Sequence, residues 1–167
     1  IDGVVSETIK FKDEAIKTGA SIDLKDATGS ADSVNIKFTD TASEDFEKLL
    51  TIAGVETINI ESDNRNATIS SSVAHTVDLV VAAATTINVT GDAGLVFGAE
   101  TGYDISKVTT LDASGMSIAK DTYQGVTYTS TYATVSGTTT ITGSGGRDTL
   151  TGNSMTDDTI SGGAGLD

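Results

Sequence analysis

The chain of 167 residues contains no cysteine, no proline and no tryptophan, and aromatic residues make up only 5% of it. Without cysteine it has no disulfide, no thiolate nucleophile and no zinc site built on sulfur. A single histidine, His75, leaves little for general-base catalysis. We expect His75, which precedes a predicted strand, to lie at the surface or at an edge of the fold. These absences argue against an enzyme.

Basic residues are also scarce. Ten Lys and Arg against 24 Asp and Glu give a formal net charge of −14, which argues against binding to nucleic acid or to a bare anionic membrane. The most apolar segment, 77–84, contains Asp78 and is far shorter than the roughly 20 residues that a membrane-spanning helix needs. We therefore expect no nucleic-acid partner and no membrane span. The sequence begins with Ile1 and shows no secretion leader, so we read it as a fragment.

Segments in which aliphatic and polar residues alternate predict half-buried β-strands. They are 33–38, 57–61, 76–79, 85–90, 108–112 and 138–142. Matching aliphatic residues are separated by 29, 24 and 30 residues, namely Ile58, Ile87, Leu111 and Ile141. Irregular periods of this length are typical of the stacked coils of a solenoid. We predict an all-β fold, a parallel β-solenoid or β-roll with irregular coils. The alternative is an antiparallel sandwich, although a tight-hairpin dipeptide occurs only at Asp2-Gly3.

One short helix is predicted near 43–53. Residues 41–44 have the composition of a capping box, and Gly54 provides a stop. Between them, apolar residues recur at helical spacing: Phe46, Leu49, Leu50 and Ala53. We expect the apolar face of this helix to pack on an end or a side of the β-structure.

Three glycine-rich units form the carboxyl end of the chain, at 143–151, 152–161 and 162–167. Each contains one aspartate in a comparable position: Asp148, Asp158 and Asp167. Glycine allows tight bends that aim carbonyl oxygens inward, and aspartate adds a carboxylate, a hard ligand of the kind that Ca²⁺ prefers. If the turns stack one coil apart, Asp148 and Asp167 bracket one calcium ion, and Asp158 faces the opposite row. The alternative is a flexible glycine-rich tail.

A weaker version of this pattern occurs at 29–34. Gly29 and Asp32 have the same spacing as Gly145 and Asp148, and an aliphatic residue again follows two positions later. Asp32 is therefore a further candidate metal ligand. An ordinary polar turn explains the pattern equally well.

The three units resemble the nonapeptide G-G-x-G-x-D-x-U-x, in which U is a large aliphatic residue, and the chain is similar to RTX proteins. Its segments 53–60 and 84–90 resemble the surface-layer branch of that group. The resemblance implies calcium sites, formed by carboxylates or backbone carbonyls, at Gly143, Gly145, Asp148, Asp158, Gly163, Gly165 and Asp167. Two features depart from the pattern: Ser144 replaces a glycine, and the middle unit has an additional residue and Met155 in place of a glycine.

The resemblance also divides the chain. It implies a solenoid-like surface-layer segment at 1–142 and RTX-type calcium-binding repeats at 143–167, continuous with it. It further implies type I secretion, a location on the bacterial cell surface, and self-association into a lattice, with cell-surface polysaccharide as another partner. Two other functions stay open: a calcium-stabilised adhesin or stalk module, and, less favoured, a β-helix enzyme that modifies polysaccharides.

Overall fold

The chain forms two β-sheets in a computed structural model that describes residues 4–12, 19–24, 28–43, 45–66, 72–132, 138–153 and 157–167. No helix capable of crossing a membrane occurs among these residues. Sheet A contains seven strands: β1 (Val4–Lys12), β3 (Ser33–Asp40), β5 (Thr57–Asn64), β7 (Thr86–Gly91), β9 (Thr110–Met116), β11 (Thr140–Thr142) and β13 (Thr159–Ser161). Sheet B contains six: β2 (Ala20–Asp23), β4 (Asp45–Ala53), β6 (Ala74–Val80), β8 (Gly94–Phe97), β10 (Gln124–Thr129) and β12 (Arg147–Thr151).

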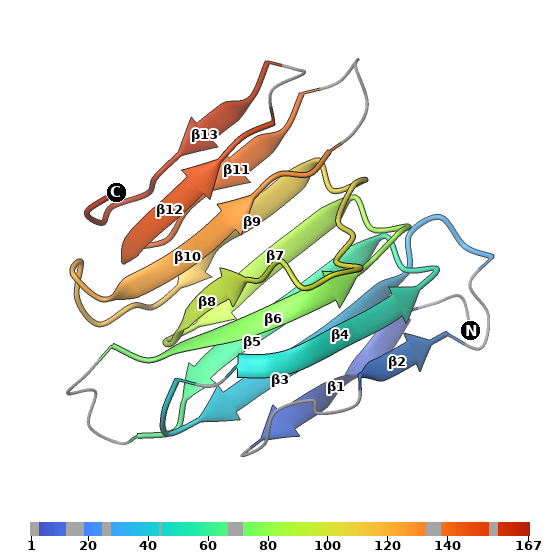
Figure 1. The fold of residues 1–167 in the computed structure, drawn as a ribbon, viewed down its shortest axis with the longest axis horizontal. Helices are drawn as coiled ribbons and strands as arrows, with labels where there is room; N and C mark the ends of the chain where they lie inside the picture. The colour runs from blue at the N-terminus through green and yellow to red at the C-terminus, as the bar shows by residue number, and fades with distance from the viewer. Residues whose placement is uncertain are drawn as a thin grey trace.

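Neighbouring strands in both sheets are parallel, and each sheet receives every second strand of the chain. The chain therefore winds in coils that each contribute one strand to sheet A and one to sheet B (Figure 1). This fold is a parallel β-solenoid, as the alternating segments predict. Ile58 pairs with Ile87, Ile87 with Leu111, and Leu111 with Ile141, so the predicted spacings match the observed register.

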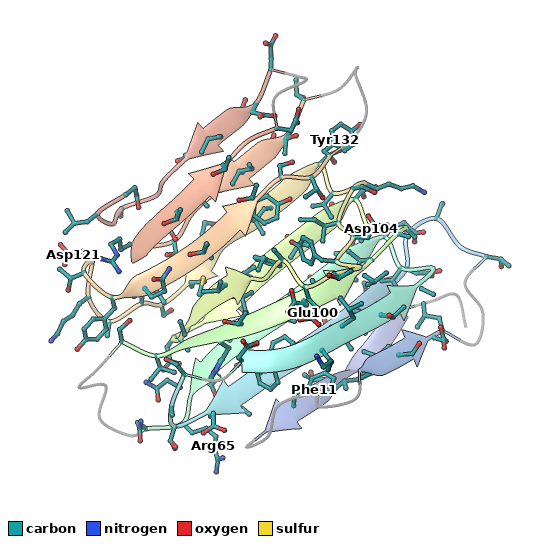
Figure 2. The ribbon with its side chains drawn as sticks, viewed as in Figure 1. Phe11, Arg65, Glu100, Asp104, Asp121 and Tyr132 are labelled. Atoms are coloured by element: carbon teal, nitrogen blue, oxygen red, sulfur yellow. The ribbon has the colours of Figure 1, made fainter. Side chains whose placement is uncertain are left out.

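The connections between the sheets lie along two edges. At the first edge the chain passes from sheet A to sheet B, and at the second edge it returns to sheet A. Arg65 and Asp121 lie along the first edge, and Asp104 and Tyr132 lie along the second (Figure 2). Residues that directly follow strands of sheet A are therefore gathered at the first edge.

Rows of aliphatic side chains fill the space between the sheets. One row runs through successive strands of sheet A and is fully buried: Val34, Ile58, Ile87, Leu111 and Ile141. Because the coils are parallel and in register, each side chain of the row packs directly on the corresponding side chain of the next coil. This arrangement builds a core with little aromatic volume.

Aromatic rings extend this core at its amino-terminal end. The ring of Phe38 lies 4.6 Å from that of Phe46 and 5.4 Å from that of Phe11, between centroids. His75 is fully buried, with its ring 5.9 Å from that of Phe46. The expected surface or edge position of His75 is therefore wrong. In β6 the inward positions begin at His75 and continue through Val77 and Leu79.

The predicted helix near 43–53 is also wrong, because Asp45–Ala53 forms β4. Phe46 pairs with Val77 of β6 and Leu50 pairs with Leu79, so the stretch between Phe46 and Leu50 is two residues longer than the stretch between Val77 and Leu79. This irregularity is a β-bulge. Residues four positions apart lie on the same face of a strand as well as of a helix, so Phe46 and Leu50 both face the core. Pairing with strands on both sides outweighs the local capping-box preference.

Both sheets continue into the glycine-rich units. β11 pairs with β9 and β13, and β12 pairs with β10. The expected boundary between 142 and 143 falls in the turn that joins β11 to β12, inside a single coil. Met155 lies outside the described residues.

The aliphatic row gives a direct test of the core. Ile87 is 0% exposed, whereas Ile160 occupies the same row on β13 and is 45% exposed. We expect Ile87→Ala to lower the free energy of unfolding by about 2–5 kcal/mol, because it leaves a cavity between neighbouring coils. Ile160→Ala should cost much less. Urea unfolding followed by circular dichroism measures both, and equal losses would contradict the assigned register.

Candidate metal site at the carboxyl-terminal turns

Two glycine-rich turns lie against each other at the first edge. One, at 143–146, joins β11 to β12, and the other, at 162–167, follows β13 one coil later. Gly143 N donates to the Ser161 carbonyl at 2.8 Å, and Ala164 N donates to the Ser144 carbonyl at 3.1 Å. A Cβ on Gly163 would overlap the Ser144 carbonyl oxygen. The close approach of the two turns therefore requires glycine.

The other predicted glycines have different surroundings. A Cβ on Gly143 would overlap the Gly162 carbonyl oxygen of the next coil, and one on Gly165 would overlap the Gly146 carbonyl oxygen. Gly145 has open space where a Cβ would lie. Contact with the neighbouring coil thus explains glycine at Gly143 and Gly165, but not at Gly145.

The Asp148 carboxylate is 5% exposed and holds two coils together. Its Oδ1 accepts hydrogen bonds from Val126 N of the preceding coil at 2.5 Å and from Ser144 Oγ at 2.9 Å. Its Oδ2 accepts a bond from Ser144 N at 2.8 Å. Ser144, the departure from the glycine pattern, thus supplies two of the three donors. Only the structure identifies Ser144 and Val126 as partners, because Val126 is 22 residues away in sequence.

Asp167 repeats this arrangement one coil later. Its Oδ1 accepts a hydrogen bond from Asp148 N at 3.2 Å, 19 residues away, and the residue itself is exposed. A Cβ on Gly162 would overlap the other carboxylate oxygen of Asp167. The structure therefore brings Asp148 and Asp167 to adjacent positions on the same edge.

Asp158 and Asp32 lie on the second edge. Asp158 precedes β13, and its Oδ1 accepts a hydrogen bond from Asn153 Nδ2 at 3.2 Å. Asp32 precedes β3, is 2% exposed, and donates its backbone N–H to Glu56 Oε2 of the next coil at 2.9 Å. Because four strands of sheet A separate β3 from β13, the structure does not bring Asp32 to the carboxyl-terminal turns.

The donor atoms at the paired turns fit a hard cation in type. Carboxylate and carbonyl oxygens are the ligands that Ca²⁺ takes in sites of six to eight oxygens. A carboxylate offers about four acceptor positions, and Asp148 uses three of them for hydrogen bonds. No group of three His, Cys, Asp or Glu that could hold a metal occurs within the described ranges. A cation here would therefore need backbone carbonyls and water besides Asp148 and Asp167.

Further carboxylates lie within or directly after earlier strands of sheet A, near the same edge, and the sequence reasoning missed them. Asp92 Oδ1 accepts a hydrogen bond from Asn64 N of the preceding coil at 2.7 Å. Asp63 Oδ2 lies 2.8 Å from Lys37 Nζ, which also lies 2.8 Å from Glu61 Oε1. The sequence signal for Asp63 and Asp92 is an aspartate two positions after the predicted strands 57–61 and 85–90.

The ion pair sets the protonation of Asp63. Burial raises the pKa of the Asp63 carboxyl, but its hydrogen bond and charge interaction with Lys37 outweigh burial and hold the pKa below its usual value. Burial lowers the pKa of Lys37, but Asp63 and Glu61 outweigh burial and raise it. The pair is therefore fully charged at neutral pH.

Replacement of Asp148 should destabilise the chain even without metal. Asp148→Asn replaces one carboxylate oxygen by an NH2 group, which cannot accept a hydrogen bond from the backbone N–H that faces it. We expect a loss of about 1–3 kcal/mol in the free energy of unfolding in EDTA. Asp167→Asn, at an exposed residue with one long hydrogen bond, should change it by less than about 1 kcal/mol. Equal losses in chemical denaturation would contradict the bonding described for Asp148.

Acid should weaken the Lys37 ion pair. The pKa of Asp63 is lower in the folded state than in the unfolded state, so its carboxylate stabilises the fold at any pH above the unfolded-state pKa. This stabilisation is lost as the pH falls through the folded-state pKa. Between about pH 5 and about pH 3, the wild type should lose more stability than Lys37→Met. Lys120→Met serves as control, because Lys120 Nζ lies over the Tyr123 ring, 4.9 Å from its centroid. If the thermal midpoints of wild type and Lys37→Met fall equally over this pH range, the ion pair does not stabilise the fold as described.

Comparison with known proteins adds no family. No protein-family model matches this chain, and the search of curated proteins found no match either. The function is therefore argued from the chain's own residues and geometry.

Proposed function

We propose that this chain is part of a non-catalytic bacterial surface-layer subunit that is secreted and uses calcium to order its carboxyl-terminal turns. The observation that carries the proposal is the contact between the turns at 143–146 and 162–167. They lie one coil apart, with Asp148 and Asp167 on successive coils. This arrangement supports the resemblance of the last 25 residues to RTX repeats.

Calcium, when bound, would add an ionic bridge between neighbouring turns. The protein's contribution is to hold oxygens at that place. Asp148 is fixed by three donors and has about one acceptor position left. Asp167 is exposed and therefore open to a cation from solvent. With about 1 mM free calcium and a dissociation constant of about 10⁻⁴ M, one site adds about 1.4 kcal/mol to the stability.

Electrostatics supports assembly through such ions. With a net charge of −14, two copies repel each other. A divalent cation at exposed carboxylates reduces this repulsion and can bridge subunits. Stacked coils alone would also suit a stalk that extends an adhesin, so the state of assembly distinguishes the two functions.

We expect calorimetric titration of the purified chain to detect calcium binding, with a rise in the thermal midpoint between EDTA and millimolar calcium. Asp167→Asn should weaken binding while it leaves the EDTA midpoint nearly unchanged, because its loss removes a ligand and only one weak hydrogen bond. Asp121→Asn, at the same edge, is the matched control.

Electron microscopy of the calcium-treated chain completes this test. Ordered sheets support a lattice subunit, whereas monodisperse particles that bind calcium support a stalk module. Identical midpoints and no binding heat would contradict the calcium site, and Asp121→Asn weakening binding as much as Asp167→Asn would contradict its location.

A further inference from the structure

The outer face of sheet A carries two rows of small polar side chains. They point outward because the residue between them on each strand belongs to the buried aliphatic row. The first row consists of Ser33, Thr57, Thr86, Thr110, Thr140 and Thr159. The second row consists of Asn35, Asn59, Asn88, Asp112, Thr142 and Ser161. We call these twelve residues the hydroxyl–amide face.

The spacing of this face is regular in two directions. Parallel strands lie about 4.8 Å apart, and residues two positions apart on one strand lie about 6.6 Å apart. Because both rows are in register across six strands, their oxygen atoms form a nearly rectangular array. Repeats of this size are of the same order as those of the water oxygens on the surfaces of ice.

The side chains of the face are held in place. Asn59 Nδ2 donates to Asn35 Oδ1 at 3.0 Å, and Asn88 Nδ2 donates to Asn59 Oδ1 at 2.8 Å. The threonines are β-branched and have restricted χ1 rotamers. A ligand that binds here therefore orders few side chains, which lowers the entropic cost of binding.

The face is almost free of charge, although the chain as a whole is strongly acidic. Asp112 is the one ionisable residue in the two rows. Beside them, Lys37 pairs with Glu61 and Asp63, at 2.8 Å from each, and the three groups together carry one net negative charge. A face of this kind is complementary to a neutral occupant. Neither row contains an aromatic residue that could stack on a sugar ring.

A hollow adjoins the face. Between β1 and β7 a polar hollow of about 150 Å³ adjoins the rows, lined in part by Thr8, Asn59 and Thr90, and it is large enough for several water molecules. The outer face of sheet B differs, because the segment after β8 crosses it. Glu100 of that segment pairs with Lys48 at 3.3 Å, and Asp104 bridges to Val80 (Figure 2).

We propose that the hydroxyl–amide face binds the surface of ice through a layer of water ordered by the two rows. Each hydroxyl donates and accepts, and each amide offers both kinds of group, so the face can continue a hydrogen-bonded water lattice. This activity does not depend on calcium bridging or on lattice formation.

The test is the gap between the melting and freezing temperatures of a single ice crystal in solutions of the purified chain, with EDTA and with millimolar calcium. We expect a gap that grows with protein concentration, and incorporation of the protein into growing ice. Thr86→Lys places a long charged side chain in the centre of the first row and should abolish both effects. Thr76→Lys, at an outward position of β6 in sheet B, should retain both.

Thr110→Val distinguishes a loss of ice binding from a loss of folding, which Thr86→Lys alone does not separate. It keeps the shape of the side chain and removes one hydroxyl, and it should reduce the gap while circular dichroism stays unchanged. A folded wild type with no gap in either buffer overturns the proposal. So does an equal loss in Thr76→Lys and Thr86→Lys. Retention on insoluble cellulose or chitin, lost in Thr86→Lys without any effect on ice, assigns the face to a neutral polysaccharide and also overturns the proposal.

Discussion

The structure depends on successive coils lying one strand spacing apart, about 4.8 Å, in the turns as well as in the sheets. The turns meet this constraint through backbone contact. At the second edge, Thr57 N donates to the Asp32 carbonyl, and Thr86 N donates to the Glu56 carbonyl. At the first edge, a Cβ on Gly91 or Gly163 would overlap a carbonyl of the preceding coil. Coil length varies, but the strands keep their register because every coil returns to the same contacts.

Carboxylates serve this stacking directly. Asp92, Asp148 and Asp167 each accept a hydrogen bond from a backbone N–H of the preceding coil, and Glu56 does the same for Asp32 N. Parallel strands of unequal length leave such donors without a partner at their ends. Much of the acidity of the chain is thus used in the fold itself. A cation at the first edge would therefore reinforce turns that protein donors already hold together.

The solenoid separates its chemistry into edges and faces. The edges carry the carboxylates and the glycine turns, where charge and backbone oxygens come together. The outer face of sheet A carries neutral hydroxyls and amides in register. Because one coil places equivalent residues at equivalent positions, a short sequence phrase such as Thr-Ile-Asn becomes a row that crosses the sheet. The proposed calcium-binding edge and the proposed ice-binding face can therefore act independently in one molecule.

The sequence by itself determined six of the strands, the all-β solenoid and the register of β5, β7, β9 and β11, because alternation and matching aliphatic residues such as Ile58, Ile87 and Leu111 recur from coil to coil. It also placed Asp148 and Asp167 on one edge and Asp158 on the other. Tertiary structure alone decided that 45–53 is a strand, because residues four apart share a face in a strand as in a helix, and only the pairing with β2 and β6 distinguishes the two. It likewise decided the burial of His75 beside Phe46 and the hydrogen bond from Val126 N to Asp148, because these partners come from neighbouring coils and lie beyond the reach of local pattern.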